Sequence, residues 1–298
     1  MNPVIRQIRF ETVLMASLVG AALAMAGVVY QSILQNPLAD PYLLGISSGA
    51  SLAAYLWRFP FLSAAVISAI GGALSQQAFT FAGAIAAVTI VFSLTGVRGR
   101  LEPVTLLLVG VIVNAVNASI YLLLNAINRD LPGSGGPLTF LVGGIPTSLD
   151  PGQKQAAAIV IGVSWLILLW LSGQLNVAVL SEGEAMSLGV RIHRLRWIAL
   201  IVSSLATASA VAISGPIGFV GLVCPHLAKL FVGQDHRKLL PVSTALGAGL
   251  LAVADAVSRK LAGQSAVGTQ LPVGVLTGLL GGPFFLILLF QSRRRAAA

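Results

Sequence analysis

The sequence predicts an all-α protein that crosses a membrane many times. Of its 298 residues, 56% are hydrophobic and 9% are charged, and the mean hydropathy is +0.92. A soluble domain carries roughly 25% charged residues, so most of this surface cannot face water. One helical crossing needs about 20 apolar residues, which leaves room for nine or ten spans with short connections. We therefore expect a single transmembrane domain over residues 1–298, without a sizeable soluble domain.

Nine apolar runs locate the expected spans. The run 61–95 is too long for one untilted helix, and the pair Gln76-Gln77 with the glycines before it marks a boundary inside it. The run 217–232 is short enough that it need not cross fully. The runs cover residues 12–33, 43–57, 61–95, 103–125, 155–175, 197–214, 217–232, 239–258 and 271–290.

Basic residues gather in four clusters between or after these runs. If the runs alternate across the membrane, all four clusters fall on one side, and Lys and Arg accumulate in cytoplasmic loops. The net charge of +9 therefore reflects topology rather than nucleic-acid binding, and the C-terminus is expected to be cytoplasmic. The clusters are Arg98 and Arg100; Arg191, Arg194 and Arg196; Arg237 and Lys238; and Arg293, Arg294 and Arg295.

A polar segment rich in Pro and Gly, N-P-L-A-D-P-Y-L-L-G-I-S-S-G-A-S, interrupts the apolar sequence between Asn36 and Ser51. Backbone without helical hydrogen bonds is tolerated at membrane depth only where protein or water satisfies it. Pro37, Pro41 and Gly45 favour a tight interhelical turn. The other interpretation is that this segment is the working part of a membrane protein.

With G-A-A-L-A-M-A-G-V-V-Y-Q at 20–31, this segment closely resembles the permeases of bacterial ABC importers for iron–siderophore complexes, haem and vitamin B12. G-F-V-G-L-V-C-P-H at 218–226 and L-P-V-G-V-L-T-G-L-L-G-G-P-F-F at 271–285 extend the match, which runs from about Ile8 to Phe290. The resemblance implies the type II ABC importer permease fold, with ten helices in the family.

One departure concerns the first family helix. It precedes the segment aligned with residues 8–33 and is missing here, which leaves about nine spans and an outward N-terminus by parity. Either the start site is placed late, or this permease lacks a peripheral helix.

The resemblance also implies a cytoplasmic gate at Asn36 and Leu38. In the family this segment lies at the cytoplasmic end of the transport pathway. A small polar side chain beside a leucine can close an empty pore without creating a tight site that would trap the substrate.

Residues 181–190, S-E-G-E-A-M-S-L-G-V, predict a short capped helix. Ser181 and Glu184 have the spacing of a capping box, and Gly189 would end the helix in the left-handed conformation. From residue chemistry alone this is a capped surface helix. The resemblance implies that it is a coupling helix presented to an ATPase subunit. The residues of that contact would be Glu182, Glu184, Ala185, Met186, Leu188 and Gly189.

Two arginines are implied in docking a substrate-binding protein. Arg9 and Arg259 align with positions that meet acidic residues of the binding protein in the B12 permease. Such rim charges mostly steer and orient docking, and snorkelling of long cationic side chains is the alternative. A second arginine expected after Arg9 falls at Thr12, with Glu11 beside it, which alters the charge offered to that partner.

The remaining polar residues give no sign of catalysis or metal binding. Asp255 is the one acid deep in an apolar run, and Arg259 at i+4 favours a structural ion pair over a functional carboxylate. His226 and His236 have no Asp or Cys arranged for a metal, so His226 is read as a helix-start histidine bonded to backbone. Cys224 is the single cysteine, which excludes a disulfide within the chain.

The leading interpretation is the transmembrane permease subunit of a binding-protein-dependent ABC importer. It would pass a ferric siderophore, haem or cobalamin into the cytoplasm by ATP-driven alternating access. The sequence has no G-x-x-x-x-G-K-[S/T] loop, so no enzymatic activity is expected. No cofactor is expected on this chain, and ATP with Mg²⁺ would bind to a separate ATPase.

The implied partners are a second copy of the permease, two ATP-binding cassette subunits and a periplasmic or extracellular binding protein, all at the bacterial inner membrane. An ion-coupled secondary transporter is the alternative, but it would need several ionisable groups within its spans, where Asp255 stands alone. A membrane enzyme ranks third, because no nucleophile, base or metal constellation converges in these loops.

Overall fold

The structure is a computed structural model of the chain. It describes residues 3–61, 63–64, 76–97, 100–127, 142–147, 149–179, 182–187, 189–262 and 271–296.

The described part of the chain is helical apart from one small hairpin. The helices are α1 (Pro3–Ile33), the 3₁₀ helix η1 (Pro41–Leu44), α2 (Ile46–Leu56), α4 (Gln76–Thr95), α5 (Pro103–Ile127), α6 (Pro151–Ala178), α7 (Glu182–Ser187), α8 (Ile192–Ser214), α9 (Val220–Val232), α10 (His236–Ala262) and α11 (Val273–Ala296). The strands β1 (Gly96–Val97) and β2 (Arg100–Leu101) pair antiparallel, a hairpin that the hydropathy pattern did not predict.

The helices follow the predicted apolar runs closely. Within the described residues, six helices (α1, α4, α5, α6, α8 and α10) are long and apolar enough to cross a membrane. The helix α4 is described from Gln76 to Thr95, and the residues directly before it, including the glycines, lie outside the described residues, so the boundary inside the run 61–95 stays a prediction. The helix α9 has 13 residues, and at about 1.5 Å per residue it is shorter than the hydrocarbon core, as predicted.

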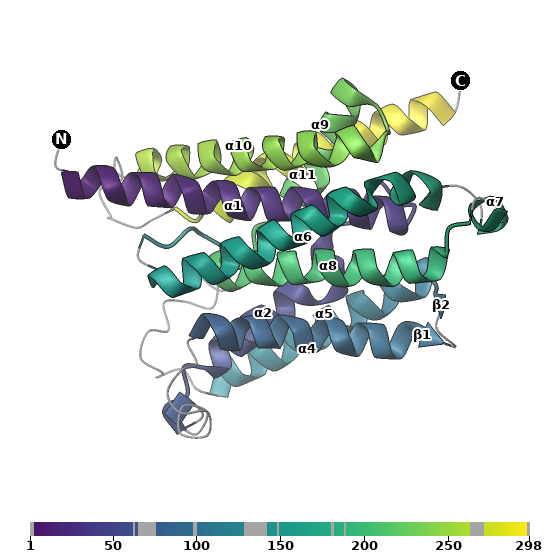
Figure 1. Cartoon of the computed structure of the whole chain (residues 1–298). Helices are drawn as coiled ribbons and strands as arrows, with labels where there is room; N and C mark the ends of the chain where they lie inside the picture. The colour runs from purple at the N-terminus through teal and green to yellow at the C-terminus, as the bar shows by residue number, and fades with distance from the viewer. Residues whose placement is uncertain are drawn as a thin grey trace.

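The two ends of the bundle carry different parts of the chain. In Figure 1, α7, the β1–β2 hairpin and the C-terminus lie toward the right, and the N-terminus lies at the left. We call these the α7 end and the N-terminal end. The basic residues of β2, of the start of α8 and of the end of α11 therefore gather toward one end, as the charge pattern predicts.

Small residues let the helices approach closely around α1. A Cβ atom on Gly20 would lie 2.1 Å from the carbonyl oxygen of Gly247 in α10, and one on Gly27 would lie 1.8 Å from that of Gly221 in α9. These glycines therefore serve helix packing, since only small residues allow such backbone contact between helices in lipid. Gly249 differs, because nothing lies within 4 Å of the position of its Cβ.

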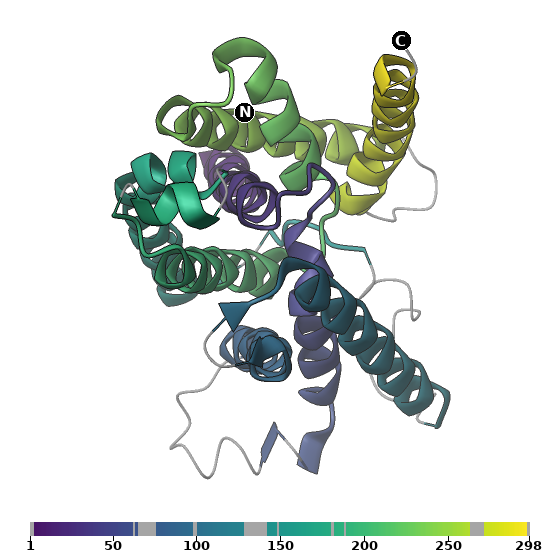
Figure 2. The same cartoon turned by 90° about the vertical axis from the view of Figure 1, so that its right-hand side faces the viewer.

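Viewed from the α7 end, the bundle divides into two groups of helices (Figure 2). One group contains α1, α6, α8, α9, α10 and α11, and the other contains α2, α4 and α5. Contacts of α8 with α4 and α2 join the groups. The segment between α1 and α2 passes from one group to the other.

Candidate functional site

The segment between α1 and α2, residues 34–45, is a compact non-α-helical connection that we call the hinge. Asn36 accepts a hydrogen bond from the backbone N–H of Leu38 through Oδ1 at 2.9 Å, which closes a tight turn. The Leu38 side chain is 43% exposed at this turn. The two residues predicted as a gate therefore belong to one turn, with the polar side chain bent back and the leucine facing outward.

The helix α5 satisfies the hinge backbone from one side. Asn114 Nδ2 donates to the carbonyl oxygen of Tyr42 at 2.9 Å. Gly110, one turn earlier, lets the Leu43 backbone approach, because a Cβ there would lie 2.0 Å from the Leu43 carbonyl oxygen. Asn117 Nδ2 donates to Ser48 Oγ at 3.1 Å, just beyond the hinge. These two asparagines are not among the residues predicted from the sequence, although two amides in an apolar run are a usable signal.

The connection between α8 and α9, residues 215–219, holds the hinge from the other side. The backbone N–H of Ile217 donates to the Tyr42 hydroxyl at 2.9 Å. The Asp40 carboxylate accepts from the backbone N–H groups of Tyr42, at 2.9 Å, and of Phe219. Phe219 has a positive φ of 69°, an uncommon conformation for a non-glycine residue. The hinge thus has both of its faces tied to distant parts of the chain.

Gln31, three residues before the hinge, compensates for a proline inside α9. Pro225 has no N–H, so the carbonyl oxygen of Gly221 loses its partner within the helix. Gln31 Nε2 donates to that oxygen and to the Leu222 carbonyl oxygen, each at 3.4 Å, and Gln31 Oε1 accepts from Lys229 Nζ at 2.9 Å. This buried amide joins the end of α1 to α9 and was also overlooked in the sequence.

The short helix predicted within residues 181–190 is present as α7, at the end of the bundle that Figure 1 shows on the right. Gly189 has φ 78°, which confirms the predicted left-handed residue after the helix. Ala185 is fully buried within the chain, so it packs α7 against the bundle. Glu184 is exposed. Leu188 and the side chains of Glu182 and Met186 lie outside the described residues.

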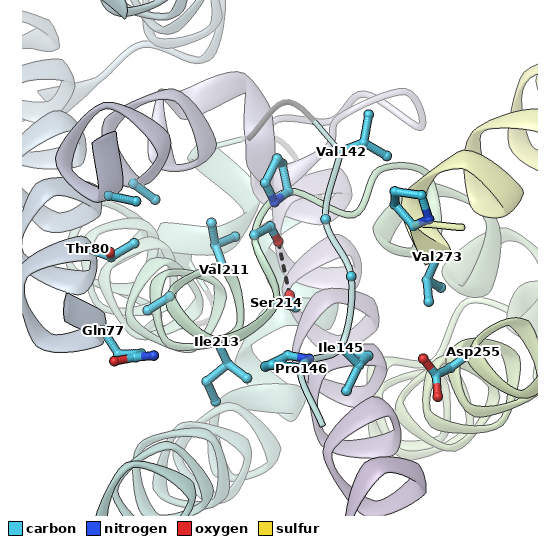
Figure 3. A pocket seen from close by; sticks show the side chains of 18 of the residues that line it. Gln77, Thr80, Val142, Ile145, Pro146, Val211, Ile213, Ser214, Asp255 and Val273 are labelled. Carbon is cyan, nitrogen blue, oxygen red and sulfur yellow. Dashed lines mark hydrogen bonds between the residues drawn. The ribbon is translucent and has the colours of Figure 1, made fainter. Parts of the chain in front are cut away.

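A cavity of about 940 Å³ opens toward the N-terminal end. Figure 3 shows Gln77 and Thr80 of α4 on one side and Asp255 of α10 on the other, with Ile145 and Ser214 between them. The start of α1, the end of α8 and the start of α11 complete the wall. Polar groups thus face the cavity from both groups of helices.

Arg9 and Arg259 both line this cavity. Arg259 Nε donates to Asp255 Oδ2 at 2.7 Å, and its Nη2 donates to the carbonyl oxygen of Ile145 at 2.7 Å. The predicted ion pair is confirmed, and it neutralises a carboxylate that is 2% exposed. Glu11 pairs with Lys154 of α6. The structure therefore brings the two predicted docking arginines to one cavity, with Arg259 held by internal contacts.

Backbone hydrogen bonds join three of the segments that form the cavity wall. Gly143 N–H donates to the Pro216 carbonyl at 2.7 Å, Gly144 N–H donates to the Ser214 carbonyl at 2.8 Å, and Gly274 N–H donates to the Gly143 carbonyl at 3.0 Å. The α8–α9 connection is thereby paired with the start of α11 through residues 143–144. Irregular backbone lining a cavity is the arrangement that membrane depth permits.

Two histidines near the α7 end have structural surroundings. His226 lies in the middle of α9, which corrects the predicted helix-start position, and its ring meets the Phe284 ring edge-to-face at 6.0 Å. Next to His236, Asp235 accepts from Asn176 Nδ2 at 2.7 Å and from the backbone N–H of Arg237, and these bonds lower the pKa of Asp235. Within the described residues, no three His, Cys, Asp or Glu side chains are grouped to hold a metal.

Comparisons with known proteins agree with this arrangement. Residues 1–291 match the model of the FecCD transport family. The hemin transport system permease HmuU of Yersinia pestis is 37% identical over 97% of this chain and 83% of its own length. The cobalamin import system permease BtuC of Halobacterium salinarum is 36% identical over 98% of this chain and 75% of its own length.

A solved structure gives the same result at the level of the fold. A transporter described as a metal-chelate type ABC transporter, in an inward-facing conformation, superposes with a TM-score of 0.82. It shares 32% identity and covers 97% of this chain and 89% of its own. With the broken hinge, the short α7 and a family match over nearly the whole chain, this protein belongs to the FecCD transport family and is a multi-pass, non-enzymatic permease subunit of an ABC importer.

Proposed function

We propose that this permease passes a ferric siderophore, haem or a cobalamin into the cytoplasm as one half of a homodimer. The observation that carries the proposal is the similarity, over nearly all of this chain, to permeases whose names specify hemin and cobalamin transport. The hinge fits this role, because Asn36 and Leu38 form a turn whose apolar side chain is exposed rather than packed into the protomer. Two such turns facing each other would form a constriction without a tight binding site.

Energy would come from two ATP-binding cassette subunits that dock on α7. In support, α7 stands at one end of the bundle with Glu184 exposed, and basic residues gather near the same end. That end would then face the cytoplasm of a bacterial cell, with the C-terminus on the same side. ATP and Mg²⁺ would be held by the partner subunits, and this chain would bind no cofactor and no nucleic acid.

A periplasmic or extracellular binding protein would deliver the substrate at the opposite end. Arg9 and Arg259 line the cavity there, and opposite charges on the binding protein would orient its docking. Ion-coupled secondary transport is disfavoured, because Asp255 already holds Arg259 at 2.7 Å and is not free to relay cations.

The test is reconstitution with the separately encoded ATPase and the binding protein of the same gene neighbourhood. Proteoliposomes would be offered labelled haemin, a ferric siderophore or cyanocobalamin, with ATP inside or with an imposed proton or sodium gradient. We expect uptake of one substrate class, requiring ATP and the binding protein. Uphill uptake by the permease alone on an ion gradient would refute the proposal.

The coupling role of α7 is tested by charge reversal of Glu182 and Glu184 to Lys. We expect loss of ATPase binding in co-purification and loss of uptake, with unchanged permease yield. Retained binding and transport would exclude α7 as the coupling element.

A further inference from the structure

The hinge and the cavity are linked by one short piece of chain. Residues 214–216 form part of the cavity wall and pair with residues 143–144. Residues 217–219, which follow immediately, bond to Asp40 and Tyr42 of the hinge. A displacement of this segment therefore acts on both places.

Hydrogen bonds hold this segment at both ends. The carbonyl groups of Ser214 and Pro216 accept from residues 143–144, while Ile217 and Phe219 donate to the hinge. The Phe219 ring fills the space where Gly281 of α11 lacks a side chain, since a Cβ there would lie 2.2 Å from the ring. Backbone held in this way moves as a unit rather than by local bending.

We propose that the α8–α9 connection is the link between the cavity and the gate turn, and that Tyr42 and Asp40 are the positioning residues that fasten the gate turn to it. The inference rests on the proposed gate function of Asn36 and Leu38. It goes further by naming what holds that turn and which surface of the cavity is mechanically connected to it. Neither Tyr42 nor Asp40 needs to touch the transported molecule.

The experiment measures the gate turn directly, in the purified permease in nanodiscs. Leu38→Cys is introduced in a Cys224→Ala background, and the rate of maleimide labelling is followed. Tyr42→Phe removes the hydroxyl that accepts from Ile217. Tyr30→Phe is the matched control, because it also removes a buried hydroxyl contact, with Ser204 at 2.6 Å between α1 and α8.

We expect Tyr42→Phe to raise the labelling rate several-fold and Tyr30→Phe to leave it unchanged, while both lower the melting temperature to a similar extent. Asp40→Asn, which keeps one acceptor for two N–H donors, should give an intermediate rate. Equal rates for Tyr42→Phe and the parent, or an equal rise in both tyrosine variants, would overturn the positioning role.

A second pair of variants tests transmission from the cavity wall. Gly215→Ala strains a residue with positive φ and brings a Cβ to 3.3 Å from Gly143 Cα, whereas Gly218→Ala meets nothing within 4 Å. Both are made in the Leu38→Cys, Cys224→Ala parent. We expect Gly215→Ala to change the labelling rate of the cysteine at the gate turn and Gly218→Ala not to change it. An unchanged rate in Gly215→Ala would overturn the link.

Labelling needs no ATPase, binding protein or substrate. A labelling result in favour of the link, combined with absent uptake in the parent proteoliposomes, would refute the transport proposal alone. Normal uptake with no labelling effect would refute the link alone.

Discussion

The seam between α1 and α10 and the hinge that follows α1 are held in place by different interactions. At the seam, Gly20 and Gly247 bring two continuous helices into backbone contact, and dispersion between close-packed atoms holds them. At the hinge, the backbone leaves the α-helix, and Asn114, Tyr42 and Asp40 hold it through side-chain hydrogen bonds. The close backbone contact at the seam has no substitute if the helices separate. At the hinge, water can take the place of a side chain that donates or accepts a hydrogen bond. The seam is therefore suited to stay fixed and the hinge to move.

The largest effect is expected from filling the space where α1 meets its neighbours. In Gly27→Leu, the new Cβ atom would lie 1.8 Å from the Gly221 carbonyl oxygen. Two packed helices cannot separate at one residue to relieve this clash. Overpacking of this kind costs about 3 kcal/mol, so the variant should yield little folded protein. Size-exclusion chromatography with thermal challenge in detergent measures this.

The control for that change is Gly249→Ala, whose Cβ would meet nothing within 4 Å. It should be neutral or stabilising by up to about 1 kcal/mol, the helix-propensity difference. A loss of folded protein equal to that of Gly27→Leu would show that α1 and α10 glycines matter for reasons other than contact.

A smaller effect is expected at the hinge, where Asn114→Ala leaves the Tyr42 carbonyl without its donor. An orphaned buried acceptor costs about 1–3 kcal/mol, and water entering the hinge reduces that cost. We expect folded protein with a lowered melting temperature and reduced uptake in proteoliposomes. Ser119→Ala, which removes an exposed hydroxyl bonded to its own helix, should change neither.

The next effect concerns Gln31, and it can be isolated by a double-mutant cycle. Gln31→Leu should cost about 1–2 kcal/mol, because the Gly221 carbonyl freed by Pro225 loses its substitute donor. Pro225→Ala restores an N–H within α9, so Gln31→Leu should cost less in that background. Equal costs in both backgrounds, measured by thermal unfolding, would show that Gln31 does not act through that carbonyl.

The smallest effect is expected at the rim, from Glu11→Gln. This change removes the ion pair with Lys154 near the N-terminal end. The Lys154 and Glu11 side chains are 22% and 35% exposed, and an ion pair that solvent reaches adds little to stability, because it is screened and two long side chains must be ordered. The melting temperature should not change measurably, and a large drop would mean that the rim, rather than the seam, fixes α6 against α1.

Features that are local in sequence were predictable. The apolar runs predicted the helices, and residue spacing predicted both the Asp255–Arg259 pair and the left-handed residue after α7. The contacts that hold the hinge were not predictable, because Asn114 bonds a carbonyl 72 residues away and Ile217 bonds a hydroxyl 175 residues away. No periodicity records such pairs, and the polar residues involved resemble ordinary interruptions of an apolar run.

The shortness of α9 has a consequence for the surrounding lipid. Its 13 residues rise by about 20 Å, roughly two thirds of a typical hydrocarbon core, and Leu230 and Phe231 near its end are more than 70% exposed. Where acyl chains cover this exposed end, they meet a helix shorter than the hydrocarbon core, which is a local hydrophobic mismatch beside Pro225 and Lys229. The thickness of the membrane would therefore affect this side of the protein, and lipids with long acyl chains would give the largest mismatch.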